Sequence, residues 1–329
     1  MRRSALSILI FTGTLLVIGT LCGGTLCGTL YAAPPPGGSD ITPTDVFARM
    51  NVVHAELELI RLEMGRPQAT PIEVSVKNAA PREVYFQAVA LFNQANGFSF
   101  ERARSTVDSP ELKTGDLRPA DVLTIVDAAL GRLREVKASL GITEAPSVEK
   151  LNTEKLPTDV LLSIMTAIRR LNLLLDKRVS PADVYRELTV AVGYTSRLRA
   201  QFPGRRMPPT PAFERRKTPS DVYRKLLGCL KRIDSIAEFS GLRILEFSVA
   251  DASIDGVEPA DVYSLGSLIV AELRFVHSRM LRVNPPPPAY YPGPKLPAHA
   301  YQRASLLERQ LIELEKHVRE HPAWLAGRS

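Results

Sequence analysis

Two histidines near the end of the chain have a spacing seen in metal sites. His317 and His321 stand in the run His-Val-Arg-Glu-His, which matches the H-x-x-E-H signature of inverted zinc peptidases. On a helix this spacing puts both imidazoles on one face. A zinc site needs a third protein ligand, however, and His321 precedes Pro322, where a helix normally stops. The two histidines are therefore weak candidates for a metal site, and we expect no cofactor.

Acidic side chains recur at one position of a six-residue cassette, which reads Ser-Pro-Ala-Asp-Val-Tyr at residues 180–185. Carboxylates from separate helices could meet inside a bundle and act as an acid and base pair. Each acid follows a proline by two residues, however, where a carboxylate caps the first turn of a helix and lies at the positive end of its dipole. We therefore interpret seven residues as helix-start acids: Asp45, Glu83, Asp121, Asp159, Asp183, Asp221 and Asp261.

Two loops have compositions that suit binding. The loop at residues 204–217 is basic, and either it binds an anion or a lipid headgroup or it is simply solvated. Its cations are Arg205, Arg206, Arg215, Arg216 and Lys217. Residues 285–292 read Pro-Pro-Pro-Pro-Ala-Tyr-Tyr-Pro, which predicts extended polyproline. That segment is either a motif for a partner or a stiff connection to the last helix.

The elements that position these residues are helices, because each cassette is a helix start. Proline at the first helical position loses no hydrogen bond, and its ring already holds φ near the helical value. A Ser or Thr before it can accept a bond from an unpaired N–H. The last cassette has His299 in place of the acid. The cassette prolines number eight: Pro43, Pro81, Pro119, Pro157, Pro181, Pro219, Pro259 and Pro297.

Apolar residues follow each cassette valine at alternating steps of four and three. This heptad pattern predicts amphipathic helices of about 20 residues, roughly 30 Å long, that pack side by side. We name each such set of positions a seam. Cys229 lies in one seam, where we expect a small core residue. The seam of the third repeat is Val122, Val126, Ala129, Leu133, Val136 and Leu140.

Spacing of the cassettes indicates a tandem duplication. The prolines are 38 residues apart within each half, except for one step of 40, and 24 residues separate the halves. We therefore predict an all-α fold made of two four-helix units, at residues 42–178 and 179–322, with a tail at 323–329. Strand signals are scarce, and the run Ile72–Val76 could form an isolated extended segment.

Helix direction depends on the connections. Loops of about 15 residues are longer than a helix when extended, so the helices of one unit could all be parallel. Up-and-down packing is the commoner arrangement, and we expect it here. The few residues between Asp176 and Ser180 predict an antiparallel hairpin of the fourth and fifth helices.

The first 33 residues have the pattern of an export signal. A positive start, Met1-Arg2-Arg3, precedes an uncharged run at residues 4–31 and then Ala32-Ala33. We expect cleavage there, followed by a flexible leader at residues 34–41. A retained inner-membrane anchor is the alternative, because the run is long enough to span a bilayer.

Composition narrows the class of function. The chain has 329 residues, 45% hydrophobic and 23% charged, as in a folded globular protein. Its formal net charge of +7 is too mild to imply a nucleic-acid partner. We recognise no phosphate loop or nucleophile motif. We therefore expect a non-enzymatic helical repeat protein of the periplasm or cell envelope that binds a protein partner or acts as a scaffold. The alternative is a bundle that binds a small ligand or metal, possibly an enzyme with a site assembled across helices.

Overall fold

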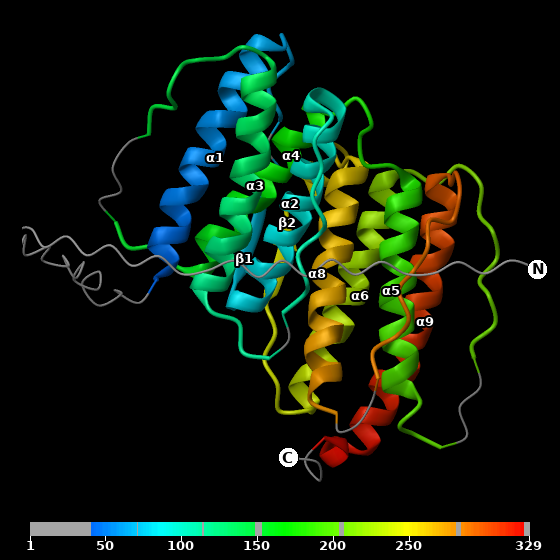
Figure 1. Cartoon of the computed structure of the whole chain (residues 1–329). Coiled ribbons are helices and arrows are strands. Elements are labelled where there is room, and N and C mark those ends of the chain that lie inside the picture. Colours follow the sequence, from blue (N-terminus) through cyan, green and yellow to red (C-terminus); the bar gives the residue numbers. More distant parts are fainter. Residues whose placement is uncertain are drawn as a thin grey trace, which may run out of the picture. The chain divides into compact units, whose positions relative to one another are not determined.

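Every long helix begins at a cassette proline (Figure 1). The computed structural model describes residues 41–70, 72–113, 115–148, 153–203, 207–280 and 284–325, so the predicted signal lies outside it. Helices dominate these residues, and the predicted all-α class is confirmed. The long helices are α1 (Pro43–Glu63), α2 (Pro81–Ala103), α3 (Pro119–Ser139), α4 (Pro157–Leu174), α5 (Pro181–Arg199), α6 (Pro219–Phe239), α8 (Pro259–Ser278) and α9 (Pro297–Glu320).

The side chain at the third helical position closes the first turn of all eight helices. At α1, the Oδ2 atom of Asp45 accepts a hydrogen bond from the Thr42 N–H at 2.8 Å. The Asp45 N–H in turn donates to the Thr42 hydroxyl at 3.4 Å. His299 takes the same role in α9, because its Nδ1 accepts the Leu296 N–H at 3.1 Å. These bonds satisfy an N–H that the helix itself leaves unpaired.

The seams form the core. The seam residues of α3 from Val122 to Val136 are all buried, and Cys229 in α6 is fully buried as predicted. Burial of each such side chain contributes about 1.5–3 kcal/mol. Within α1–α4, which we name the first bundle, α1 and α2 each contact α3 and α4. In the second bundle, α5 and α6 each contact α8 and α9, so both bundles have the same neighbour pattern.

Within each bundle the helices are parallel, so the prediction of up-and-down packing is wrong. In the first bundle, Arg49 pairs with Asp127 and, seven residues later in both helices, Glu56 pairs with Arg134. In the second, Lys225 pairs with Glu308 and Arg232 with Glu315, again seven residues on. The connecting loops run back along the bundle (Figure 1).

A physical reason for the parallel order lies in the cassettes. Four helix starts meet at one end of the first bundle, where the four prolines and the four cassette valines line one shallow apolar depression. The seams, which have the same spacing from the cassette valine, then lie in register along the bundle. Gathering four positive dipole ends is unfavourable, but the acid of each cassette offsets this charge where it arises.

The two bundles run in opposite directions (Figure 1). Helix α2 lies antiparallel to α8, because Arg82 reaches Glu272 while Gln87, further along α2, donates to the carbonyl of Ser264 at 3.0 Å. α4 and α5 are therefore opposed across the short connection at residues 175–180, and both contact α8. The described residues between 41 and 325 form one compact unit.

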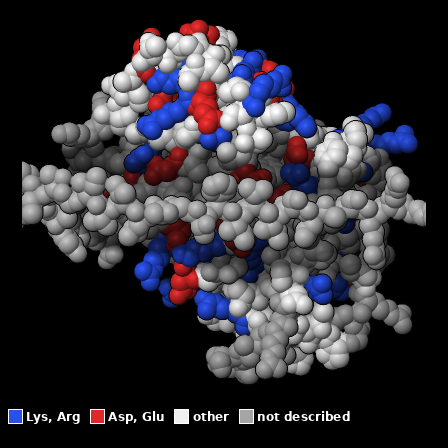
Figure 2. Space-filling model, viewed as in Figure 1, with Lys and Arg blue, Asp and Glu red and all other residues white. Residues whose placement is uncertain are grey.

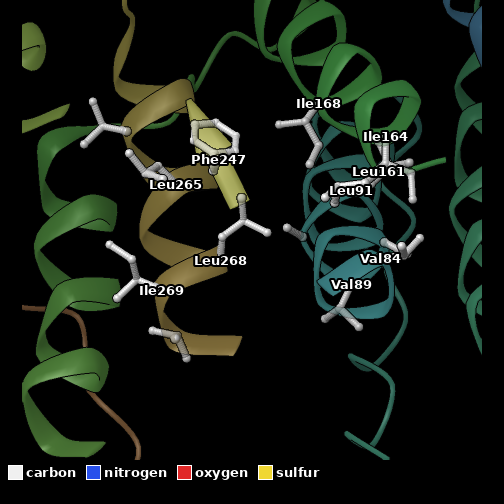
Figure 3. Close-up of a cluster of buried hydrophobic side chains, with 14 of the residues drawn as sticks. Val84, Val89, Leu91, Leu161, Ile164, Ile168, Phe247, Leu265, Leu268 and Ile269 are labelled. Carbon is white, nitrogen blue, oxygen red and sulfur yellow. The ribbon is translucent and has the colours of Figure 1, made fainter. Parts of the chain in front are cut away.

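A pair of short strands also joins the bundles. β1 (Val74–Lys77) pairs antiparallel with β2 (Glu246–Val249), with Val74 opposite Val249. The expected extended segment is therefore not isolated. Figure 3 shows Phe247 of β2, Leu268 of α8 and Ile168 of α4 pointing into the space between the bundles, where all three are buried. A four-residue helix, α7 (Asp251–Ile254), and a 3₁₀ turn, η1 (Pro322–Trp324), complete the described elements.

Candidate functional site: a cavity at the junction of the bundles

A cavity of about 590 Å³ lies where the bundles meet. This volume is within the range of small-molecule sites, roughly 300–1,000 Å³. Its walls are α4, the segment that leads into β1 with the first residue of that strand, and the first two turns of α6 and α8. One face of α4 supplies five of the lining residues, at the spacing of successive helical turns: Leu162, Met165, Thr166, Arg169 and Arg170.

Arg169 and Asp261 form an ion pair across this cavity wall. Asp261 is the helix-start acid of α8, and its carboxylate is 13% exposed; the Arg169 side chain on α4 is 11% exposed. Arg169 also donates to the Thr70 carbonyl at 2.6 Å and the Gly256 carbonyl at 3.3 Å. Burial raises the pKa of Asp261, while the Arg169 guanidinium and the Glu258 N–H act in the opposite direction. A helix cap therefore also connects the two bundles.

Arg170, the next residue, is a half-buried cation that makes no ion pair with any residue the structure describes. Its Nη1 lies 3.4 Å from Nδ1 of His54, whose Nε2 is 3.0 Å from the Ser163 hydroxyl. The nearby Glu58 carboxylate already holds Arg61 through two bonds of 2.9 and 2.7 Å. Burial, and then Arg170, lower the pKa of His54 to about 4, so this imidazole is neutral at pH 7.

A second polar group at the junction contains two fully buried carboxylates, Glu83 of α2 and Glu272 of α8. Arg82 lies between them, with its Nε 2.5 Å from Glu83 and its Nη2 3.3 Å from Glu272. The Ala80 and Leu245 N–H groups donate to Glu83 and Glu272, at 2.6 and 3.3 Å respectively. Burial, followed by the adjacent Glu83 carboxylate, raises the pKa of Glu272 well above its ordinary value. The pair is therefore best accommodated with a proton on Glu272.

We predict that this proton makes stability depend on pH. A carboxyl with a raised folded pKa stabilises the fold fully below the unfolded pKa of about 4.5, and this contribution is lost as pH rises toward the folded pKa. Burial also raises the pKa of Glu187, to about 7, which adds to the same trend. Glu272→Gln should therefore raise the melting temperature at pH 8 and leave it nearly unchanged at pH 4.5. Equal effects at both pH values would contradict a shared proton.

The two candidate metal residues pack against an aromatic ring. Helix α9 ends at Glu320, so His321 lies outside it and the pair is not on one helical face. The rings of His317 and His321 lie 5.5 and 6.2 Å from that of Phe202, on which Trp324 also stacks. Among the residues that the structure describes, no group of three or more His, Cys, Asp or Glu could hold a metal ion.

The basic loop is described only in part, because Arg205 and Arg206 lie outside the described residues. Arg215 and Arg216 are exposed. Lys217 pairs with Glu214 at 2.9 Å and lies over the Tyr301 ring at 4.2 Å. On the face shown in Figure 2, basic and acidic side chains are interspersed where grey atoms do not cover them.

The helix-start acids differ in their surroundings. The cap bonds from Thr42 and Thr218 lower the pKa of Asp45 and Asp221. Lys113, at 2.6 Å, lowers that of Asp121. Asp159 and Asp183 accept the N–H groups of Leu156 and Ser180 at 2.8 and 3.0 Å. At the junction, Glu83 pairs with Arg82 and Asp261 with Arg169.

Sequence reasoning missed Arg169, Arg170 and Glu272. Arg169 and Arg170 interrupt the apolar sequence of α4, and Glu272 stands among Val270, Ala271 and Leu273 in α8. A charge within an apolar run was therefore the available signal.

Among the helices that the structure describes, none has both the length and the apolar character needed to cross a membrane. Comparisons of the chain with protein-family models, with curated proteins and with solved structures gave no match.

Proposed function

We propose that this is an exported, non-enzymatic helical binding protein that holds a small organic ligand in the junction cavity. The observation that carries the proposal is a cavity of about 590 Å³ with a partly apolar wall and four charged lining residues, two of them paired with each other, between two bundles joined by buried polar contacts. Ligand sites are typically apolar clefts with a few placed polar groups, and often lie between packed units.

Filling the cavity tests this proposal. Thr166 lines the cavity from an exposed position of α4, so Thr166→Trp should occupy the space at little cost in stability. Native mass spectrometry of the full chain, purified from cells in which it is produced, should show a bound small molecule that the variant loses. Thr124→Trp, at an exposed position of α3, is the matched control and should retain it. Equal occupancy in both variants would contradict the site.

A second candidate function, a scaffold for a protein partner in the envelope, is favoured by the polyproline segment. Tyr290 is 85% exposed, whereas Pro286, Ala289 and Pro292 are half-buried. That spacing of three is the period of a polyproline helix, so one edge lies on the protein and two face solvent. A partner captured from envelope extracts by the native chain, and lost in Pro288→Ala/Tyr291→Ala, would support this function.

Export and duplication belong to the same proposal. The uncharged run at residues 4–31 followed by Ala32-Ala33 supports export. The intact mass of the secreted chain should correspond to removal of about the first 33 residues.

The 38-residue spacing and the common neighbour pattern of the two bundles support a tandem duplication of a four-helix unit.

A further inference from the structure

We infer that the ligand of the junction cavity is a monoanionic amphiphile, an organic carboxylate whose head group pairs with Arg170. This inference rests on the proposed function and specifies its ligand. The half-buried Arg170 lines the cavity beside an apolar wall to which Ile72, Leu162 and Met165 contribute. A ligand that matches both features has one charged end and an apolar body.

The two arginines that line the cavity differ in their partners. Each nitrogen of the Arg169 guanidinium has a partner, which is Asp261 or the carbonyl of Thr70 or Gly256. Arg170 makes no ion pair within the described part of the chain, and its nearest ring nitrogen belongs to a neutral imidazole. A partly buried cation is stabilised by an anionic partner, and the planar guanidinium matches a carboxylate through two parallel bonds.

The other lining residues limit the number of negative charges that the ligand can carry. Asp261 and the exposed Glu73 are the acids of the cavity lining. Both would repel a second negative charge on the ligand. Arg170 is the one lining cation without an ion pair among the described residues, although its charge also acts on the nearby Glu58 carboxylate. A monoanion is therefore favoured over a dianion such as an alkyl phosphate at pH 8.

The body of the ligand follows from the walls. Apolar side chains come from two elements, α4 and the segment that precedes β1, so an aliphatic or aromatic group in contact with both would lose contact with water. A ligand that consists of a head group alone would make no contact with these apolar side chains. We therefore expect affinity to increase with chain length from butanoate to decanoate.

Isothermal titration of the full chain at pH 8 with sodium decanoate, decyl phosphate and decyltrimethylammonium tests the inference. Decanoate should bind most tightly, and Arg170→Met, which keeps the apolar volume, should weaken it on the order of 10- to 100-fold. Arg319→Met removes a charge from an exposed residue of α9 and should leave the affinity unchanged. Thr166→Trp should abolish binding.

The outcomes separate the two proposals. If all three probes bind equally and only Thr166→Trp blocks them, the cavity is a ligand site but the preference for a carboxylate is overturned. If no probe binds, the inference of a carboxylate amphiphile is overturned, and the native mass spectrum of the co-purified ligand decides the proposed function. If the probes bind but Thr166→Trp has no effect on binding, the cavity is not the site and both proposals are overturned. The ranking of the probes on the native chain does not depend on whether Arg170→Met folds.

Discussion

Arg169→Met is expected to lower the free energy of unfolding by about 3–5 kcal/mol, because it leaves the Asp261 carboxylate without its cation in a site with little solvent. Methionine preserves most of the aliphatic contact that the arginine stem makes. The substitution also frees the Thr70 and Gly256 carbonyls, which lose their donors. Urea denaturation at pH 7 measures the change.

The double variant Arg169→Met/Asp261→Asn is the decisive control. It removes both charges while the asparagine side chain keeps an oxygen that can accept the Glu258 N–H. We expect it to recover most of the loss, since an uncompensated buried charge costs more than a missing pair. If the single and double variants are equally unstable, the cost arises from packing or from the two carbonyls and not from the charge.

The second large effect is expected in the core of the first bundle. Val126→Asp replaces a fully buried seam residue of α3 with a carboxylate that has no partner in the seam. Loss of apolar burial costs about 1.5–3 kcal/mol, and the unpaired charge adds several more. The sum is a large fraction of the 5–15 kcal/mol that typically stabilises a domain, so the bundle should lose cooperative folding.

Ala128→Asp introduces the same side chain two residues away, at an exposed position of α3. We expect a change within about 0.5–1 kcal/mol there. Circular dichroism at 222 nm during heating, with limited proteolysis, distinguishes the two. A native-like melting curve for Val126→Asp would show that the α3 seam is not the buried face.

Local rules explain why the helices could be predicted from the sequence. Proline, the cap acid and the seam act within one helix, so Pro119, Asp121 and Val122 are sufficient to indicate where α3 begins and which face it buries. The strand β2 carried a signal too, because Leu245, Phe247 and Val249 alternate with polar residues. Its pairing with β1 depends on how the bundles dock, which no local pattern encodes.

The candidate site could not be predicted either, because it also depends on how the two bundles dock. Glu83 and Asp261 look like the other cap acids in sequence, yet they differ because α2 and α8 lie at the junction. Helix direction was also undetermined, since a long loop permits either order. Sequence reasoning therefore located the acids but could not show that Asp261 pairs with Arg169 of the other bundle or that Glu83 lies beside the buried Glu272.

Parallel packing has a consequence for the folding rate. Helices that contact each other within a bundle begin at least 38 residues apart in the chain, as Pro81 and Pro119 do. No pair can assemble as a simple helical hairpin, so each contact first requires closure of a long loop, at an entropic cost. Relative contact order is therefore high for an all-helical protein, and refolding should be slower than in up-and-down bundles of similar size.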